Sequence, residues 1–184
     1  MKNKIILLLL IPLLFASCYE VKLELPTYIE KIYVKKFVNE VGEYNLEVDV
    51  TNTVIGEFLK DGRLQIVDKE SEAHAVLEGV ITKYEVQPIA WDYVKNIVTE
   101  NRLKISVRIR FYDKVKNELL FEDYTQTGGY LSGEASFSVV ASTPETEKDA
   151  KYRAALDLAK DIVSRVIEGW PEAESYQEQR SQSQ

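Results

Sequence analysis

The stretch that decides the fold is Arg102-Leu103-Lys104-Ile105-Ser106-Val107-Arg108-Ile109-Arg110-Phe111, in which polar and apolar residues alternate strictly. Successive side chains of a β-strand point to opposite faces of its sheet. The alternation is therefore typical of a strand with one face in a core and the other in water or against a partner. No other part of the chain carries so clear a structural signal.

Further strands are expected on both sides of this stretch. After it, residues 113–117 form a hairpin connection, and residues 118–127 form the antiparallel return strand. Before it, three more strands are expected, at residues 29–38, 63–68 and 76–87. The last of these three ends at Pro88, because proline has no backbone N–H to donate to a sheet.

An amphipathic helix is expected at residues 45–59, between the first two of these strands. Apolar side chains recur there about every four residues. Asn45 is a plausible N-cap, and Asp61-Gly62 stops the helix. Several β-branched residues lower its intrinsic helix propensity, so its stability must come from docking on a sheet.

A second helix is expected near the C-terminus. Thr146 and Asp149 form a capping box, the apolar face reaches Ile167, and Gly169 ends the helix. The segment before it, residues 128–143, is rich in glycine and hydroxyl side chains and is predicted to be a long loop.

These elements predict an α+β fold, a two-layer α/β sandwich in the order β-α-β-β-β-β-α. A strand–helix–strand unit with so long a crossover brings its two strands together in parallel, and the later strands add as a meander. We therefore expect a mixed sheet of four to five strands with both helices on one face. The opposite face is left available to a partner.

The N-terminus has the pattern of an export signal. Two lysines precede an apolar run at residues 5–15, which is too short to span a bilayer. The following Leu14-Phe15-Ala16-Ser17-Cys18 resembles the lipobox cleaved by the bacterial lipoprotein signal peptidase. The resemblance implies a diacylglyceryl thioether, with palmitate, on Cys18. The alternative is an ordinary secretory cleavage that leaves a buried cysteine.

The lipobox sets the expected organisation and location of the chain. Residues 1–17 are the signal peptide, 18–28 a lipidated tether, 29–170 one α/β domain and 171–184 a disordered polar tail. Tyr19 stands where aspartate commonly signals inner-membrane retention. Sorting by this rule favours the periplasmic side of the cell outer membrane, with the lipid as membrane anchor.

Composition and motifs argue against several classes of function. Thirty acidic against 23 basic residues give a net charge of −7, which disfavours nucleic acid as a partner. The only histidine, His74, has no second histidine or free cysteine beside it, so neither a metal site nor a cofactor is expected. Phosphate-binding glycine motifs are absent, and Gly128-Gly129 does not lie between a strand and a helix. The sequence contains no recognisable catalytic set, so we expect no enzyme.

Four basic residues form the one candidate binding site. Arg102, Lys104, Arg108 and Arg110 project from one face of the predicted strand. One interpretation is that this basic stripe docks phosphate groups through bidentate arginine contacts. The other is that glutamates on neighbouring strands neutralise it, with Glu78, Glu118 and Glu122 as candidates.

The order of residues resembles the lipopolysaccharide-assembly lipoproteins of the LptE family. The matching segments are Leu25-Pro26, residues 29–39 (IEKIYVKKFVN), residues 61–64 (DGRL), residues 73–81 (AHAVLEGVI), residues 119–123 (LLFED) and an alanine-rich final helix that reaches Trp170. The chain departs from the family at Tyr19, where glycine is frequent, and at His74, where aspartate is frequent. These departures indicate a distant member.

The resemblance implies a non-catalytic assembly factor that plugs and supports the β-barrel LptD and binds lipopolysaccharide. The basic stripe would then meet the phosphates of lipid A. TolB-type and curli-secretion domains share the same order of elements, so a structural lipoprotein of another envelope exporter is an alternative. A small-molecule binder, with residues 128–143 as a lid, is a further alternative.

Overall fold

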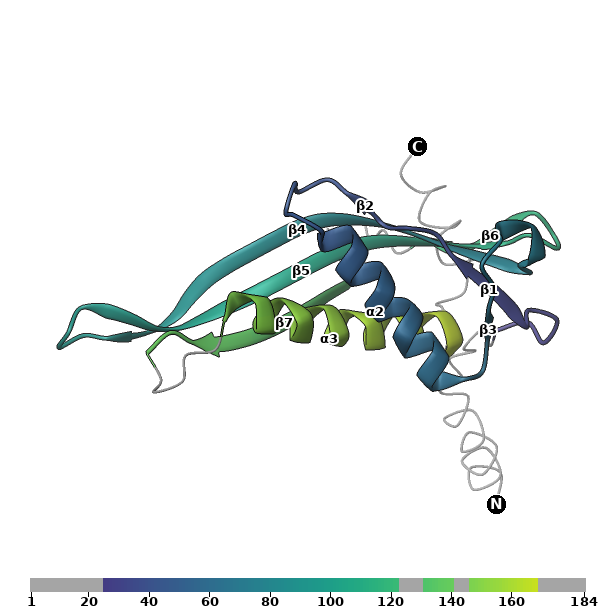
Figure 1. The fold of residues 1–184 in the computed structure, drawn as a ribbon. Coiled ribbons are helices and arrows are strands. Elements are labelled where there is room, and N and C mark those ends of the chain that lie inside the picture. The colour runs from purple at the N-terminus through teal and green to yellow at the C-terminus, as the bar shows by residue number, and fades with distance from the viewer. Residues whose placement is uncertain (1–24, 123–130, 141–145, 169–184) are drawn as a thin grey trace, which may run out of the picture.

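The computed structural model describes residues 25–122, 131–140 and 146–168 (Figure 1). Two helices, α2 (Leu46–Asp61) and α3 (Glu147–Glu168), pack on one face of a curled mixed sheet. The strands are β1 (Lys31–Val34), β2 (Val38–Asn39), β3 (Gln65–Ile66), β4 (Ala75–Asp92), β5 (Ile97–Asp113), β6 (Glu118–Glu122) and β7 (Leu131–Ser138), and a short 3-10 helix, η2, spans Glu70–Glu72. The predicted α+β class is confirmed.

The sheet has five positions across it, in the order β3-β1-β4-β5-β6. Two further strands extend these positions. β2 follows β1 along one edge of β4, and β6 and β7 pair with successive parts of the far edge of β5. The pairs β1/β3, β1/β4 and β2/β4 are parallel, whereas the pairs made by β5 are antiparallel. The mixed sheet expected from the long crossover is therefore present.

The core lies between the sheet and the two helices. Within the alternating stretch of β5 the apolar residues are fully buried, as the alternation predicts, and they are Leu103, Ile105, Val107, Ile109 and Phe111. The buried faces of the helices meet them, with Val54 and Phe58 on α2 and Leu158 and Ile162 on α3. Burial of this apolar face stabilises α2, whose own helix propensity is modest.

The prediction that β4 ends at Pro88 was wrong, because the strand continues to Asp92. Its register with β5 shifts between Pro88 and Ala90, so the proline lies at an irregularity of the ladder, where a missing N–H is tolerated. In the same way β5 begins at Ile97, before the alternating stretch. Together the two strands make a hairpin that projects beyond both helices (Figure 1).

The predicted loop at residues 128–143 was also wrong in its central part, which is the strand β7. Gly133 was a misleading signal. A Cβ there would lie 1.9 Å from the backbone oxygen of Ala154 and 2.5 Å from the backbone nitrogen of Leu158, so the glycine permits close approach of α3. Residues 128–130, with Gly128-Gly129, and residues 141–143 lie outside the described residues.

The helix boundaries agree with the sequence, but one cap does not. The side chain of Asn45 makes no capping hydrogen bond, and its φ is 59°, so the expected N-cap was wrong in its chemistry. Gly62 ends α2 with a φ of 77° and donates its N–H to Phe58. The capping box of α3 is confirmed, because the Asp149 N–H donates to the Thr146 hydroxyl at 3.2 Å.

Candidate functional site

The structure brings the four predicted basic residues together on the sheet face that points away from the helices. They alternate along β5 with fully buried apolar residues. Between 37% and 51% of each side chain remains exposed. The predicted basic stripe therefore exists as a geometric feature and is accessible to a partner.

A carboxylate on β7 binds the first two members of the basic stripe. Lys104 Nζ lies 2.8 Å from Oε1 of Glu134, and Arg102 Nε lies 3.8 Å from Oε2 of the same residue. The hydrogen bond from Lys104 holds the pKa of Glu134 below its ordinary value, and the positive charge of Arg102 acts in the same direction. One carboxylate is thus shared by two cations.

The other two members have separate partners. Arg110 Nε donates to Glu122 of β6 at 2.7 Å, and this hydrogen bond raises the pKa of Arg110. Arg108 Nη2 lies 3.6 Å from Glu40, in the segment after β2. The Nε of Arg108 is buried and has no hydrogen-bond partner among the described residues. Arg108 is therefore the least completely satisfied member of the basic stripe.

Of the three glutamates expected to neutralise the basic stripe, Glu122 forms an ion pair with it. Glu78 lies opposite Arg110 in the β4–β5 ladder and, after the hydrogen bond to Glu122, its charge helps to raise the pKa of Arg110. Glu78 pairs with Lys35 at 2.8 Å, and Glu118 lies 3.8 Å from Lys116. The sequence reading missed Glu134, because its segment was read as a loop. The alternation of Gly133, Ala135 and Phe137 with polar residues was the signal that could have identified this strand.

The ion pairs of the basic stripe are too exposed to be strong. Salt bridges between solvent-accessible side chains contribute about 0–1 kcal/mol each, because water screens the charges and ordering long side chains costs entropy. An anion with several negative charges can therefore exchange with these carboxylates at small cost. The arrangement suits reversible binding of phosphate groups and equally suits a self-neutralised surface.

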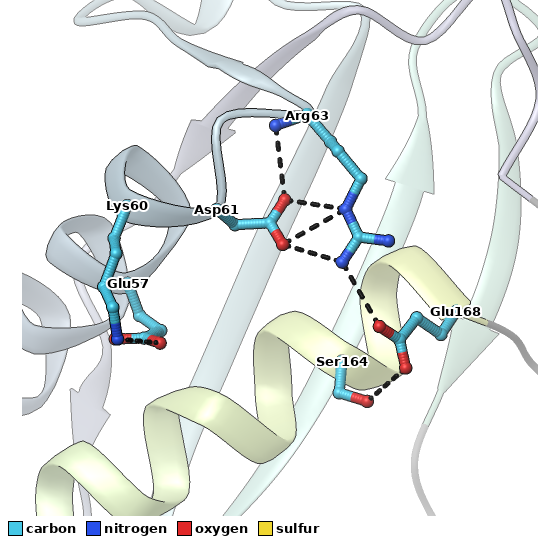
Figure 2. Close-up of polar contacts among 6 residues, drawn as sticks. All are labelled: Glu57, Lys60, Asp61, Arg63, Ser164 and Glu168. Carbon is cyan, nitrogen blue, oxygen red and sulfur yellow. Dashed lines mark hydrogen bonds and ion pairs between the residues drawn. The ribbon is translucent and has the colours of Figure 1, made fainter.

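A second charged region links the C-terminal ends of the helices (Figure 2). The Arg63 guanidinium donates to Asp61 at 2.7 Å and to Glu168 at 3.2 Å. The hydrogen bond to Asp61 is the main cause that raises the pKa of Arg63, with a smaller contribution from Glu168. These residues border a shallow cleft of about 300 Å³, together with Lys60 and Lys160. Opposite charges alternate there, and the exposed pair of Arg63 with Glu168 joins the segment after α2 to the end of α3.

The remaining candidates from the sequence either make structural contacts or lie outside the described residues. Nδ1 of His74 accepts a hydrogen bond from the Glu30 N–H at 3.2 Å, so this side chain joins the start of β4 to the residue before β1. Within residues 25–122, 131–140 and 146–168, no three metal-ligating side chains converge. Cys18, the signal peptide, Trp170 and the tail at 171–184 lie outside the described residues.

In the described part of the chain, neither α2 nor α3 is sufficiently long and apolar to cross a membrane. None of the curated proteins compared with this chain matches it.

Solved structures of similar shape exist at low sequence identity. A hypothetical protein from Chlamydia trachomatis is 13% identical, with 75% of this chain and 95% of that chain covered and a TM-score of 0.48. A putative lipoprotein from Caulobacter crescentus is 15% identical, with 70% and 83% covered and a TM-score of 0.44. An uncharacterized lipoprotein B from Nitrosomonas europaea is 17% identical, with 83% and 91% covered and a TM-score of 0.44.

A family model matches the chain directly. It is the LptE model, described as lipopolysaccharide-assembly, and it matches residues 29–166, from the residues before β1 almost to the end of α3. The resemblance found in the sequence is thereby confirmed, and with it the prediction of a non-enzymatic protein. Because the match covers well over half of its length, this chain belongs to the LptE lipopolysaccharide-assembly family.

Proposed function

We propose that this chain is an outer-membrane lipoprotein, acylated on Cys18, that plugs and supports an LptD-type β-barrel during lipopolysaccharide assembly. The observation that carries the proposal is the family match, which spans the whole helix-covered domain. The lipobox before Cys18 supports the anchor, because two or three acyl chains hold a protein on a bilayer permanently. The role is positional: the lipid holds the domain at the periplasmic side of the membrane while its faces fill the barrel.

The basic stripe gives this role a ligand contact. Arg102, Lys104, Arg108 and Arg110 bind the phosphates of lipopolysaccharide in exchange for the carboxylates of Glu134, Glu122 and Glu40. Arginine presents a planar fork of donors that matches phosphate oxygens two at a time. Each exposed ion pair given up is weak, so a polyanionic ligand gains more than the protein loses.

Replacing the four residues of the basic stripe with glutamine tests the ligand contact. We expect weaker binding of lipopolysaccharide and an unchanged far-UV circular dichroism spectrum, because all four side chains are partly exposed. The matched control removes the same charge from positions outside the basic stripe, by glutamine at the exposed residues Lys60, Lys69, Lys148 and Lys160. Equal binding by the two quadruple variants contradicts the ligand role of the basic stripe.

Crosslinking in the native envelope tests the barrel partner. A photo-reactive residue at Lys83, which lies opposite Ser106 in the β4–β5 ladder and whose side chain is 51% exposed, should capture an LptD-type barrel. Capture of a barrel from a different exporter contradicts the proposal and favours the TolB-like alternative. Replacing Cys18 with serine should abolish incorporation of labelled palmitate and release the protein from the membrane fraction.

A further inference from the structure

Arg108 has different surroundings from the other three members of the basic stripe. Its side chain is 37% exposed, the lowest value of the four, and its Nε is buried without a hydrogen-bond partner among the described residues. Lys104 and Arg110 each have a glutamate oxygen at hydrogen-bond distance, 2.8 and 2.7 Å away. Arg102 lies 3.8 Å from its carboxylate but is 51% exposed, so water reaches it. Of the four residues, Arg108 therefore has the least satisfied donor.

The position of Arg108 in the sheet explains why it lacks a partner. β6 pairs with β5 as far as Arg110, and β7 pairs with it only up to Val107. The register of these strands thus places no glutamate opposite Arg108, as it places Glu122 opposite Arg110. On the other side, its neighbour in β4 is Val80, whose side chain has no acceptor. The outer sheet face around Arg108 is therefore poor in groups that could bind its guanidinium.

The carboxylate that pairs with Arg108 is held weakly. Glu40 Oε2 lies 3.6 Å from Arg108 Nη2, which is beyond hydrogen-bond distance. The Glu40 side chain is 54% exposed, so water screens the pair. The backbone of Glu40 is fixed, because its N–H donates to the carbonyl of Ile81 at 3.1 Å. The carboxylate can therefore turn away from Arg108 without a movement of the backbone.

The geometry of the guanidinium group defines the ligand that would complete this site. A buried donor without an acceptor lowers stability, and more so when it carries charge. Nε and one Nη of an arginine present two parallel N–H groups, which match two oxygens of a phosphate. The carboxylate of Glu40 approaches only Nη2. An anion that takes both donors, and carries more charge than a carboxylate, displaces it at small cost.

We propose that Arg108 is the primary phosphate ligand of the basic stripe and that Glu40 is its internal competitor. The inference rests on the proposed function, because it gives an order to the contacts of the same site. A phosphate group of a glycolipid displaces the Glu40 carboxylate and accepts the Nε–H and Nη–H of Arg108 together. The neighbouring charges of Arg110 and Lys104 then support the bound phosphate.

Correlation spectra of the arginine Nε–H groups test the contact at the atom concerned. They are recorded on the full acylated chain in detergent, and the Arg108 signal is assigned by its loss in Arg108→Lys. Pyrophosphate, which presents the same chemistry, should shift this signal at lower concentration than the signals of Arg102 and Arg110. An unshifted Arg108 signal, or equal shifts of the three arginines, overturns the proposal.

Two forms of lipopolysaccharide then identify the source of the phosphate. The intact molecule should shift the Nε–H signal of Arg108, and the same molecule stripped of its phosphates should not. A shift caused by the stripped molecule shows that phosphate is not what Arg108 binds. A shift caused by pyrophosphate but not by intact lipopolysaccharide assigns the site to a free phosphate and overturns its role in glycolipid binding.

Single substitutions test the order of the contacts. Arg108→Lys keeps the charge but removes the Nε–H, and we expect it to weaken lipopolysaccharide binding about tenfold, because hydrogen bonds between charged groups are strong. Arg102→Lys is the matched change at a more exposed member of the basic stripe and should weaken binding clearly less. Unchanged circular dichroism spectra exclude misfolding as the cause. Equal losses in the two variants contradict the primary role of Arg108.

A pair of glutamate substitutions tests the competitor. Glu40→Gln should strengthen lipopolysaccharide binding by about two- to threefold, the equivalent of one weak exposed ion pair. Glu72 provides the matched control, because it is 56% exposed and lies 3.6 Å from Lys69, outside the basic stripe. Glu72→Gln removes the same charge and should change the affinity far less. Equal gains would mean that only net charge matters, which overturns the role of Glu40.

The quadruple glutamine variant of the basic stripe separates this inference from the proposed function. If that variant binds lipopolysaccharide as well as its control, the ligand contact itself fails, and the role of Arg108 fails with it. If the quadruple variant loses binding while Arg108→Lys and Arg102→Lys lose equal amounts, only the present inference is overturned.

Discussion

The two ends of β5 carry the same turn in different surroundings. One turn is Asp92-Tyr93-Val94-Lys95-Asn96 and the other is Asp113-Lys114-Val115-Lys116-Asn117. In each, the aspartate Oδ1 accepts the N–H groups of the residues two and three positions later, at 2.7–3.0 Å. In each, the asparagine adopts a positive φ, 53° in the first and 56° in the second. Five residues are thus enough to specify the turn.

What differs is the protein around each turn. Tyr28 donates a hydrogen bond to Asp113, which is 1% exposed, and the ammonium group of Lys116 lies 5.2 Å from the centre of the Tyr28 ring. Lys114 also donates to the carbonyl of Glu70. In the other turn, by contrast, Val94 is 97% exposed. Local sequence therefore sets the shape of a hairpin, whereas tertiary packing decides whether its tip is a support or a free surface.

Disrupting β7, which pairs with the middle of β5, should have the largest effect on stability. Gly133→Ala forces a Cβ against the backbone of α3 at Ala154 and Leu158, neither of which can move without shifting the helix. We expect a loss of about 3 kcal/mol or more in the free energy of unfolding, measured by urea denaturation. Hydrogen exchange should show the amide groups of β7 losing protection first, which would leave more of β5 paired with β4 alone.

The control for this substitution is Gly56→Ala, on the exposed side of α2. A Cβ at Gly56 would meet nothing within 4 Å, and alanine favours a helix over glycine by about 1 kcal/mol. This variant should therefore be more stable than the parent chain. Similar stability of the two alanine variants would show that α3 and β7 do not pack as closely as the structure has them.

Removing the aspartate of each turn should sharpen the difference between the two ends. Asp113→Ala should cost about 2 kcal/mol, because a buried carboxylate that accepts three hydrogen bonds is lost. Asp92→Ala removes two hydrogen bonds at an open tip, where water replaces them, and should cost about 1 kcal/mol or less. Urea denaturation measures both. Equal losses would mean that the contact with Tyr28 adds nothing.

The sequence predicts the parts of this fold that follow from periodicity. The alternation from Arg102 to Phe111 identifies β5 and its two faces, because burial of one face requires a period of two. It does not predict β7, since Gly133 serves helix packing and reads as a loop signal. For that reason Glu134, which pairs with two members of the basic stripe, was not found. The extension of β4 past Pro88 was missed because a register shift absorbs the proline.

The smallest effect concerns the pH dependence of the supported turn. Burial alone raises the pKa of Asp113, but the hydrogen bonds from Tyr28 and from the N–H groups of Lys116 and Val115 outweigh it and lower the pKa. A carboxyl group whose pKa is lowered by folding stabilises the fold above its ordinary pKa of about 3.9 and loses that contribution as pH falls through the lowered value. The parent chain should therefore exceed Asp113→Asn in unfolding free energy at neutral pH, and the gap should close in acid. A gap that stays constant down to pH values below the ordinary pKa would show that the charge of Asp113 does not contribute to holding this end of β5.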